Sequence, residues 1–448
     1  METIGRHLLP HLHEALDGFR AVVLHGARQC GKSTLARLLA DQRGGTYASL
    51  DDEATRDAAL ADPSGFLLDQ PHPLVVDEVQ LGGDRVVRAL KQIVDADPAR
   101  GRFLLTGSTN FLTVPTISES LAGRVRILRL WPLSQAELAG CSTPGAWDWI
   151  EGFDASPRKP MPAGSPRSGR RSCVSLVCRG GFPEIVAMRS GLRSGWFESY
   201  VETVIERDVV ALGDLRRRAV LAPLVRWIAA STSSELNVQA VSSRLGVDRA
   251  TMESYLDWME TVFLMHRLPA WSRRMQSRAV RRPKIHISDT GLAAALLGVG
   301  PNSLTAPTSP SAGPLFESFA VNEIVRQLSA SRPAERAHHY RDHDGREVDL
   351  LLERPDGAVT AVEVKATSSP RAEDLRHVAW LRDRLDVTSP GDFRAGVLLH
   401  TGHQHLTVGD RLYLRPIQSL WATSASRLAG SPALAPAAGK REPDRPSV

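Results

Sequence analysis

Cysteine is scarce in this sequence, with four residues in 448, at positions 30, 141, 173 and 178. Thiols so few and so scattered exclude a disulfide framework and suit a reducing compartment. The pattern Cys173-x4-Cys178 resembles half of a zinc site, but no second Cys or His pair follows nearby at a suitable spacing. We therefore predict no zinc.

Long apolar runs are also missing. The closest candidate, residues 291–300, is far too short to cross a bilayer, and the first residues carry no apolar signal core. We therefore expect a cytoplasmic protein with no membrane partner. The length predicts several domains, and the formal net charge of +5, which comes from Arg-rich patches, permits a nucleic-acid partner without proving one.

The strongest chemical signal lies in residues 21–41. An apolar run predicts a buried strand, the pattern G-x-x-x-x-G-K-[ST] follows, and leucines then recur at helical spacing. Glycines let backbone N–H groups surround a phosphate, and the next helix points its positive end at the same anion. We expect Lys32 to reach the β and γ phosphates of ATP and Ser33 to bind Mg²⁺. The predicted nucleotide-binding residues of this loop are Gly26, Ala27, Arg28, Gln29, Cys30, Gly31, Lys32, Ser33 and Thr34.

A second predicted strand, residues 74–76, ends directly in Asp77 and Glu78. We expect Asp77 to hold the Mg²⁺ through water and Glu78 to act as the catalytic residue that orients or deprotonates the attacking water. A third strand, residues 103–105, precedes Ser108 and Asn110. Either side chain could sense the γ phosphate, or it could simply end the strand in a turn.

Helices and strands alternate from residue 20 to residue 130, which predicts a parallel sheet sandwiched by helices. This is an α/β fold of the P-loop NTPase type. Arg124 lies after the strand predicted at residues 103–105. It could act as a catalytic arginine finger toward a neighbouring subunit of a homo-oligomer, or it could lie on a solvated loop.

The middle of the chain is less regular. Residues 144–178 are rich in Pro, Ser and Arg and predict a flexible insertion, after which a helix is expected to expose residues 206–208. Residues 237–256 have the order of a helix-turn-helix, with a wing strand expected at 262–265. A basic cluster follows: Arg267, Arg273, Arg274, Arg278, Arg281, Arg282 and Lys284. The cluster favours contact with DNA phosphates, although such helical units also serve as protein-packing modules.

A second chemical constellation lies near the C-terminus. Two strands are predicted at 348–352 and 359–365, and the turn between them places Asp349 opposite Glu363. Strand period puts Glu363 and Lys365 on one face, and Glu317 lies on the preceding helix. This set suits metal-assisted phosphodiester hydrolysis, with Asp349, Glu363 and Glu317 as Mg²⁺ ligands and Lys365 as a catalytic residue. The alternative is a hairpin with one polar face and a Glu–Lys pair.

A series of motifs runs along the chain from about residue 5 to residue 415: GARQCGKSTL, the Leu50-Asp51-Asp52 strand end, VVDEVQ, LLTGS, LAGR, GGFPE, FESYVETVIERDV, ISDTGLAAALLG, GPLFESFAVNEI, GREVDLLLE and AVEVKA. In these motifs and their order the chain resembles one family, the prokaryotic AAA-type ATPases that carry a C-terminal domain of unknown function with a restriction-endonuclease-like fold. The resemblance implies ATP binding at Lys32, Ser33 and Asp77, a winged-helix middle, and a PD-(D/E)xK-like core at Glu317, Asp349, Glu363 and Lys365.

The combined prediction is an AAA-type ATPase core at 1–143, the insertion at 144–178, a helical and winged-helix region at 179–300, a restriction-endonuclease-like domain at 301–425 and a disordered tail at 426–448. The function expected is ATP hydrolysis coupled to DNA binding, with metal-dependent DNA cleavage as a further hypothesis. The alternative is a non-cleaving, ATP-dependent switch that regulates binding to a protein or DNA partner.

Overall fold

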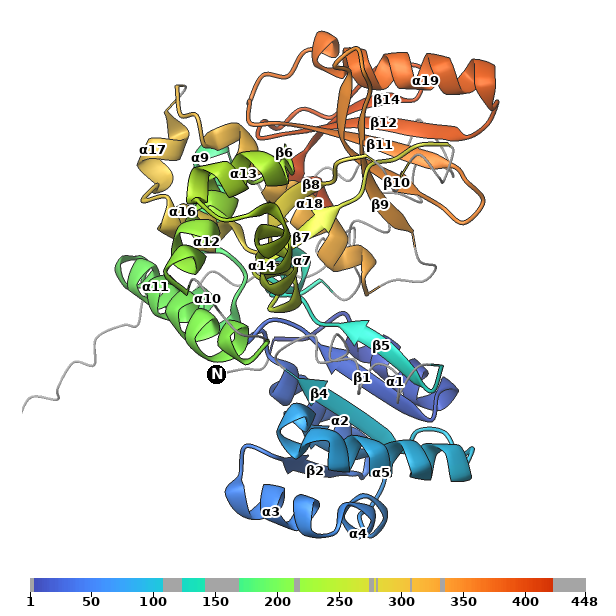
Figure 1. Ribbon diagram of the computed structural model, residues 1–448. Coiled ribbons are helices and arrows are strands. Elements are labelled where there is room, and N and C mark those ends of the chain that lie inside the picture. The colour runs from blue at the N-terminus through green and yellow to red at the C-terminus, as the bar shows by residue number, and fades with distance from the viewer. Residues whose placement is uncertain are drawn as a thin grey trace, which may run out of the picture.

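The computed structural model describes residues 4–107, 123–141, 169–212, 218–273, 278, 281–306, 308–330 and 335–421. In Figure 1 the N-terminal sheet lies at the bottom, the helices of the middle region lie above it, and the C-terminal sheet lies at the top. Within these ranges, no helix combines the length and apolar character needed to cross a membrane. The tail predicted at 426–448 lies outside the described residues.

The N-terminal part contains a parallel five-stranded sheet in the order β2-β3-β4-β1-β5. Its strands are β1 (Ala21–His25), β2 (Thr46–Ser49), β3 (Leu74–Asp77), β4 (Phe103–Gly107) and β5 (Val125–Arg129). Its helices are α1 (Leu9–Gly18), α2 (Lys32–Arg43), α3 (Glu53–Ala61), α4 (Pro63–Leu68), the 3₁₀ turn η1 (Val79–Gly82), α5 (Gly83–Ala96) and α7 (Gln135–Leu138). The predicted parallel sheet is confirmed.

Apolar residues cover both faces of this sheet. Val22 and Leu24 of β1 belong to the core that includes α1 and α2, whereas Ala21 and Val23 belong to the core that includes α5. Successive strand residues point to opposite faces, so a short run of apolar residues is what a strand buried on both sides requires.

The middle region is mainly helical and contains a small antiparallel sheet with the strand order β6-β8-β7. Its helical elements are α9 (Arg170–Arg179), α10 (Pro183–Ala187), η3 (Ser190–Leu192), α11 (Arg193–Thr203), the π-helical turn η4 (Val204–Val209), η5 (Val210–Leu212), η6 (Arg218–Val220), α12 (Leu221–Ala230), α13 (Val238–Leu245), α14 (Arg249–Thr261), α16 (Thr290–Leu296) and α17 (Pro301–Thr305). Its strands are β6 (Ser234–Glu235), β7 (Met265–Leu268) and β8 (Lys284–Ile287).

Two expectations for this region need correction. The predicted insertion cannot extend to residue 178, because α9 is helical and buries Cys173, Val174 and Val177 on one face. The arginines and serines around these three residues concealed a short amphipathic helix. Asp208, expected to be exposed, is buried because a π-helical turn carries more residues per turn and rotates it inward.

The C-terminal part is a six-stranded mixed sheet in the order β13-β14-β12-β11-β10-β9. Its strands are β9 (Arg336–Arg341), β10 (Glu347–Glu353), β11 (Val359–Lys365), β12 (Phe393–His400), β13 (Leu406–Gly409) and β14 (Leu412–Pro416). Its helical elements are α18 (Ala312–Leu328), η7 (Ala372–Leu375), α19 (Arg376–Thr388) and η8 (Ile417–Leu420). The predicted hairpin is confirmed, since β10 and β11 pair antiparallel around a turn closed by the bond from Gly357 N to Arg354 O, 2.9 Å.

Helix α18 joins the three parts. The Glu323 carboxylate accepts hydrogen bonds from the backbone N–H of Gln135 (2.9 Å) at the start of α7. Arg326 donates to the carbonyls of Leu133 (3.1 Å) and Ser288 (2.8 Å), which follow β5 and β8 respectively. Buried polar groups need such partners, so these bonds fix the N-terminal domain and the middle region on one helix.

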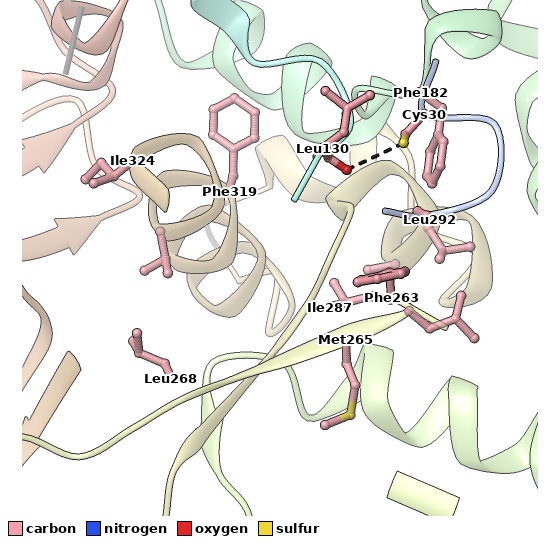
Figure 2. Packing of buried hydrophobic residues seen from close by; sticks show 14 of the residues in the cluster. Cys30, Leu130, Phe182, Phe263, Met265, Leu268, Ile287, Leu292, Phe319 and Ile324 are labelled. Carbon is pink, nitrogen blue, oxygen red and sulfur yellow. Dashed lines mark hydrogen bonds between the residues drawn. The ribbon is translucent and has the colours of Figure 1, made fainter. Parts of the chain in front are cut away.

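The same junction is apolar between those bonds. Figure 2 shows Cys30 of the phosphate loop and Leu130, which follows β5, in one cluster with Phe182 and Phe263 of the middle region and Phe319 of α18. The Cys30 thiol lies 3.5 Å from the carbonyl oxygen of Leu130. Cys30 is fully buried and serves to pack the loop against its surroundings.

Candidate nucleotide site and carboxylate cluster

The loop between β1 and α2 has the backbone of a phosphate-binding loop. Gly26, Gln29 and Gly31 have φ values of 157°, 61° and 97°. A Cβ atom at Gly26 would lie 2.1 Å from the carbonyl oxygen of Leu130, so only glycine fits there. Left-handed residues alternating with ordinary ones turn successive N–H groups toward one point, which is how a loop surrounds an anion.

Lys32 is held inside this loop. Its ammonium donates hydrogen bonds of 3.0 Å to the carbonyl oxygens of Gly26 and Ala27, and the residue is buried. Ser33 follows at the start of α2 and is half-buried, and Thr34 is exposed. The lysine therefore already points to where the motif requires a phosphate-binding cation.

Asp77 ends β3, which is separated from β1 by β4. Its carboxylate accepts hydrogen bonds from the hydroxyl groups of Tyr47 and Thr106. Sequence reasoning missed both partners, although Thr106 lies in the LLTGS motif, two residues before the predicted sensor Ser108. Two hydroxyl donors fix the orientation of the Asp77 carboxylate.

Glu78 has a φ of 53°, and the side-chain amide of Gln80 donates to its carboxylate. A non-glycine residue at positive φ is uncommon and marks a position where the backbone is constrained. The structure therefore places both acidic residues at the carboxyl end of β3.

The predicted sensor candidates and the predicted arginine finger differ in outcome. Ser108 and Asn110 lie outside the described residues, although β4 does pair with β1 as the sensor hypothesis requires. Arg124 is engaged within the chain, because its Nη2 lies 3.1 Å from the Asp95 carboxylate of α5. A role for Arg124 in a neighbouring subunit stays a prediction.

Residues of the middle region contact the phosphate loop directly. The guanidinium of Arg28 forms two hydrogen bonds of 3.1 Å with the Asp208 carboxylate, and the Tyr200 hydroxyl donates to the Arg28 carbonyl at 3.4 Å. From the N-terminal side, Arg6 also donates to the carbonyl of Cys30 at 2.7 Å. None of these partners was predicted, since they lie 24 to 180 residues from the loop.

The predicted carboxylate cluster also assembles. The register pairs Leu350 with Val362, and its continuation by one residue places Asp349 opposite Glu363, as predicted. The Asp349 carboxylate accepts the backbone N–H of Val364 at 2.9 Å, and Lys365 Nζ lies 2.6 Å from the Glu363 carboxylate.

A residue that the prediction assigned to DNA binding lies in the middle of this cluster. Lys284 of β8 is 1 % exposed, and its ammonium lies 2.7 Å from Glu317, 3.3 Å from Asp349 and 2.5 Å from Glu347. Burial alone would lower the pKa of Lys284, but the three carboxylates raise it above its usual value. A tethered cation therefore lies where Mg²⁺ was predicted to bind.

The acidic side chains respond to burial and to one another. Burial and the charge of Asp349 raise the pKa of Glu317 well above its usual value, against the attraction of Lys284. The same two effects raise the pKa of Glu363 to about 8. One Glu363 carboxylate oxygen is buried without a hydrogen-bond partner among the described residues. Over the same residues, no group of three His, Cys, Asp or Glu side chains has a metal-binding arrangement.

Glu363→Gln is expected to flatten the pH dependence of stability between about pH 4.5 and pH 8. Because the folded-state pKa of Glu363 is raised, its stabilising contribution is fully present below the unfolded pKa of 4.5 and is lost as pH rises through about 8. The wild-type free energy of unfolding should fall there by up to about 1.4 kcal/mol per pH unit from this group. Denaturant titrations across the window measure the slope, with the exposed residue Glu373→Gln as the control. A slope equal to that of wild type in Glu363→Gln would contradict this assignment.

Most of the predicted basic cluster is also engaged within the chain. Arg278 forms two bonds of 2.6 and 2.7 Å with the Glu353 carboxylate, and Arg273 pairs with Asp392. The backbone N–H of Trp271 donates to the His339 carbonyl at 2.6 Å, which attaches the chain after β7 to strand β9. Arg274 lies outside the described residues. Lys284 is buried, so the prediction that it contacts DNA phosphates is wrong for this conformation. DNA contact by the arginines of the cluster stays a prediction.

Comparison with known proteins agrees with the nucleotide site. A family profile described as an AAA domain matches residues 18–139, and two described as domains of unknown function, DUF8612 and DUF4143, match residues 170–303 and 312–420. Residues 18–139 are therefore a P-loop ATPase domain of the AAA type, and ATP binding and hydrolysis are supported at the level of that family. The C-terminal match names no activity.

The relatives at the level of the whole sequence are uncharacterized proteins. Those of Mycobacterium bovis and Mycobacterium tuberculosis are each 28 % identical over 394 residues, which covers 87 % of this chain and 80 % of theirs. One from Haemophilus influenzae is 22 % identical, covering 60 % of this chain and 67 % of its own.

Two solved structures are similar to part of the chain. A Walker-type ATPase of Pyrococcus abyssi is 15 % identical, covers 66 % of this chain and 96 % of its own, and has a TM-score of 0.42. The RuvB Holliday junction branch migration motor of Thermotoga maritima is 18 % identical, covers 59 % and 90 %, and has a TM-score of 0.28.

Proposed function

We propose that the chain is an ATP hydrolase that works as a switch, in which the nucleotide state controls how the middle region and the C-terminal domain meet a protein or DNA partner. The observation that carries the non-cleaving form of this proposal is the Lys284 ammonium among Glu317, Glu347 and Asp349. A buried cation with three carboxylate partners offsets part of the negative charge of the cluster without a metal ion.

The residues of the ATP site fit ATP and Mg²⁺. Lys32 would bind the β and γ phosphates, Ser33 and Asp77 would hold the Mg²⁺, and Glu78 would accept a proton from the water that attacks the γ phosphorus. Mg²⁺ supplies neutralisation of charge on the phosphate oxygens. The positive φ values of the loop and the buried Lys32 support this assignment.

The route from the ATP domain to the rest of the chain supports a switch. Glu323 and Arg326 of α18 hydrogen-bond to the backbone at Gln135 and Leu133, a few residues after β5 of the ATPase sheet. The same helix carries Glu317 at the carboxylate cluster. A rearrangement of the ATPase domain would therefore act directly on α18, because hydrogen bonds and not a long flexible linker connect the two.

The arrangement of α13, Gly246, α14 and the sheet β6-β8-β7 supports the winged-helix hypothesis for the middle region. The basic segment after β7 contacts the C-terminal domain in this arrangement, through Arg278 and Trp271. This favours a protein-packing role of the unit in the conformation described, with DNA contact as a role that requires the segment to detach.

Metal-dependent DNA cleavage is the second candidate, and one specific observation favours it. Asp349, Glu363 and Lys365 lie together, and a buried Glu363 oxygen has no partner among the described residues. A metal ion could use these oxygens only if Lys284 left Asp349, because the ammonium already contacts that carboxylate.

One set of assays on the full chain distinguishes the two candidate functions, the switch and DNA cleavage. We expect ATP hydrolysis by the wild type, no nicking of plasmid DNA with Mg²⁺ or Mn²⁺ and ATP, and a change in hydrogen exchange of α18 between ATP and ADP. Nicking that Asp349→Ala abolishes would replace the switch by the cleavage hypothesis. Absence of any ATP-dependent change in α18, with hydrolysis intact, would refute the switch alone.

A further inference from the structure

The pair between Arg28 and Asp208 joins the phosphate loop to the middle region. Arg28 Nε and Nη2 each lie 3.1 Å from one oxygen of the Asp208 carboxylate, so the two planar groups meet edge to edge. The Asp208 side chain is 7 % exposed and that of Arg28 is 29 % exposed. A bidentate pair of this kind is among the stronger and more directional polar contacts in proteins.

The middle region is shaped to present this carboxylate. Asp208 lies on the π-helical turn that follows α11, and such turns occur frequently at functional sites. Tyr200 of α11 donates to the Arg28 carbonyl at 3.4 Å, so two side chains of one helical segment contact the same loop residue. A buried carboxylate is costly without a partner, and Arg28 supplies two N–H groups.

The Arg28 guanidinium also interacts with a charge of the nucleotide site. Its hydrogen bonds to Asp208 raise the pKa of Arg28 more than burial lowers it, and the charge of Glu78 raises the pKa further. Glu78 is the residue expected to act on the water at the γ phosphate. Arg28 is four residues before Lys32 in the same loop.

We propose that the Arg28 guanidinium binds the γ phosphate of ATP and that Asp208 competes for it, so that ATP, but not ADP, breaks the Arg28–Asp208 pair. This inference rests on the proposed ATP site. Two oxygens of a γ phosphate can accept paired hydrogen bonds from the guanidinium, as a carboxylate does, and the γ phosphate carries more charge. ADP lacks that group, and Asp208 then keeps its partner.

The consequence lies in the middle region. Once Arg28 turns to phosphate, Asp208 is a buried carboxylate without its cation, which destabilises the contact between the π-helical turn and the loop. The segment from α11 through η4 therefore loosens with ATP and closes again with ADP. By linkage, the factor by which ATP weakens the Arg28–Asp208 pair equals the factor by which the pair weakens ATP binding. A change at Asp208 that breaks the pair and leaves Arg28 in place should therefore favour ATP binding.

Nucleotide affinities of four proteins test this assignment: the wild type, Asp208→Asn, Arg28→Ala and the double variant. The probes are the non-hydrolysable analogue with a β,γ-imido bridge and ADP, each with Mg²⁺, measured by calorimetry on the full chain. We expect Asp208→Asn to bind the analogue about tenfold more tightly, with ADP affinity changed less than about twofold. Arg28→Ala should weaken the analogue alone, and the double variant should match Arg28→Ala.

Two results would overturn the inference: an equal effect of Asp208→Asn on both nucleotides, or the same gain from Asp208→Asn when Arg28 is already alanine. If neither nucleotide bound to any of the four proteins, the proposed ATP site itself would be wrong, which is a different outcome. Hydrogen exchange of residues 193–209 in the wild type is a measurement that needs no variant. The analogue should raise exchange there relative to ADP, and equal exchange with both would also refute the competition.

Discussion

Replacing Lys32 by alanine is expected to reduce ATP turnover by about a hundredfold or more, roughly 3 kcal/mol of transition-state stabilisation. The ammonium lies inside the phosphate loop, 3.0 Å from the Gly26 and Ala27 carbonyls, so its removal takes away the cation aimed at the β and γ phosphates. Phosphate release at saturating ATP measures the effect.

Lys91→Ala on the outer side of α5 is the matched control, because Lys91 is half-buried and distant in sequence from the loop. It should leave turnover unchanged. ATP hydrolysis by Lys32→Ala at the wild-type rate would show that the phosphate loop is not part of the catalytic site. Circular dichroism of both variants shows whether the fold is retained.

Replacing Lys284 by methionine is expected to destabilise the C-terminal domain by about 3–5 kcal/mol at neutral pH, because three carboxylates lose their common buried cation. Methionine has a similar length and cannot neutralise them. This loss of stability should be smaller in acid, because the carboxylates take up protons there. Glu317 takes up its proton readily, because its pKa is raised. Hydrogen exchange of β10 and β11 reports the stability of this domain directly.

Adding a divalent cation to Lys284→Met tests whether the carboxylate cluster can bind a metal ion. If Asp349 and Glu317 can hold a metal ion once the ammonium is gone, Mn²⁺ should restore part of the protection lost in Lys284→Met. It should not do so in Lys284→Met combined with Asp349→Asn. Full stability of Lys284→Met without metal at neutral pH would contradict the role assigned to Lys284, and Lys91→Met again serves as the control.

The phosphate loop could be predicted because its chemistry lies in consecutive residues. Gly26, Gly31 and Lys32 act through backbone conformation and local reach, and the apolar runs beside them specify the strand and the helix that hold them. The opposition of Asp349 and Glu363 was also predictable, since a short turn sets the register of a hairpin. In both cases the sequence separation is small.

Lys284 shows where that reasoning ends. In the sequence it closes a run of arginines and predicts a surface for DNA, whereas in the fold its ammonium is buried among Glu317, Glu347 and Asp349. Arg278 likewise binds Glu353, 75 residues away. The charge of a residue is visible in the sequence, but the partner that neutralises it depends on which strands the fold places side by side.

The sequence by itself determined the ATPase domain, its phosphate loop and the acidic hairpin, because each depends on neighbouring residues whose periodicity and turn chemistry are local. Only the tertiary structure decided what those sites contact. Strand β8 carries Lys284 into the carboxylate cluster, and a π-helical turn carries Asp208 to Arg28 across 180 residues. The physical reason is that a buried charge requires an opposite charge nearby, and the packing of distant elements chooses which one.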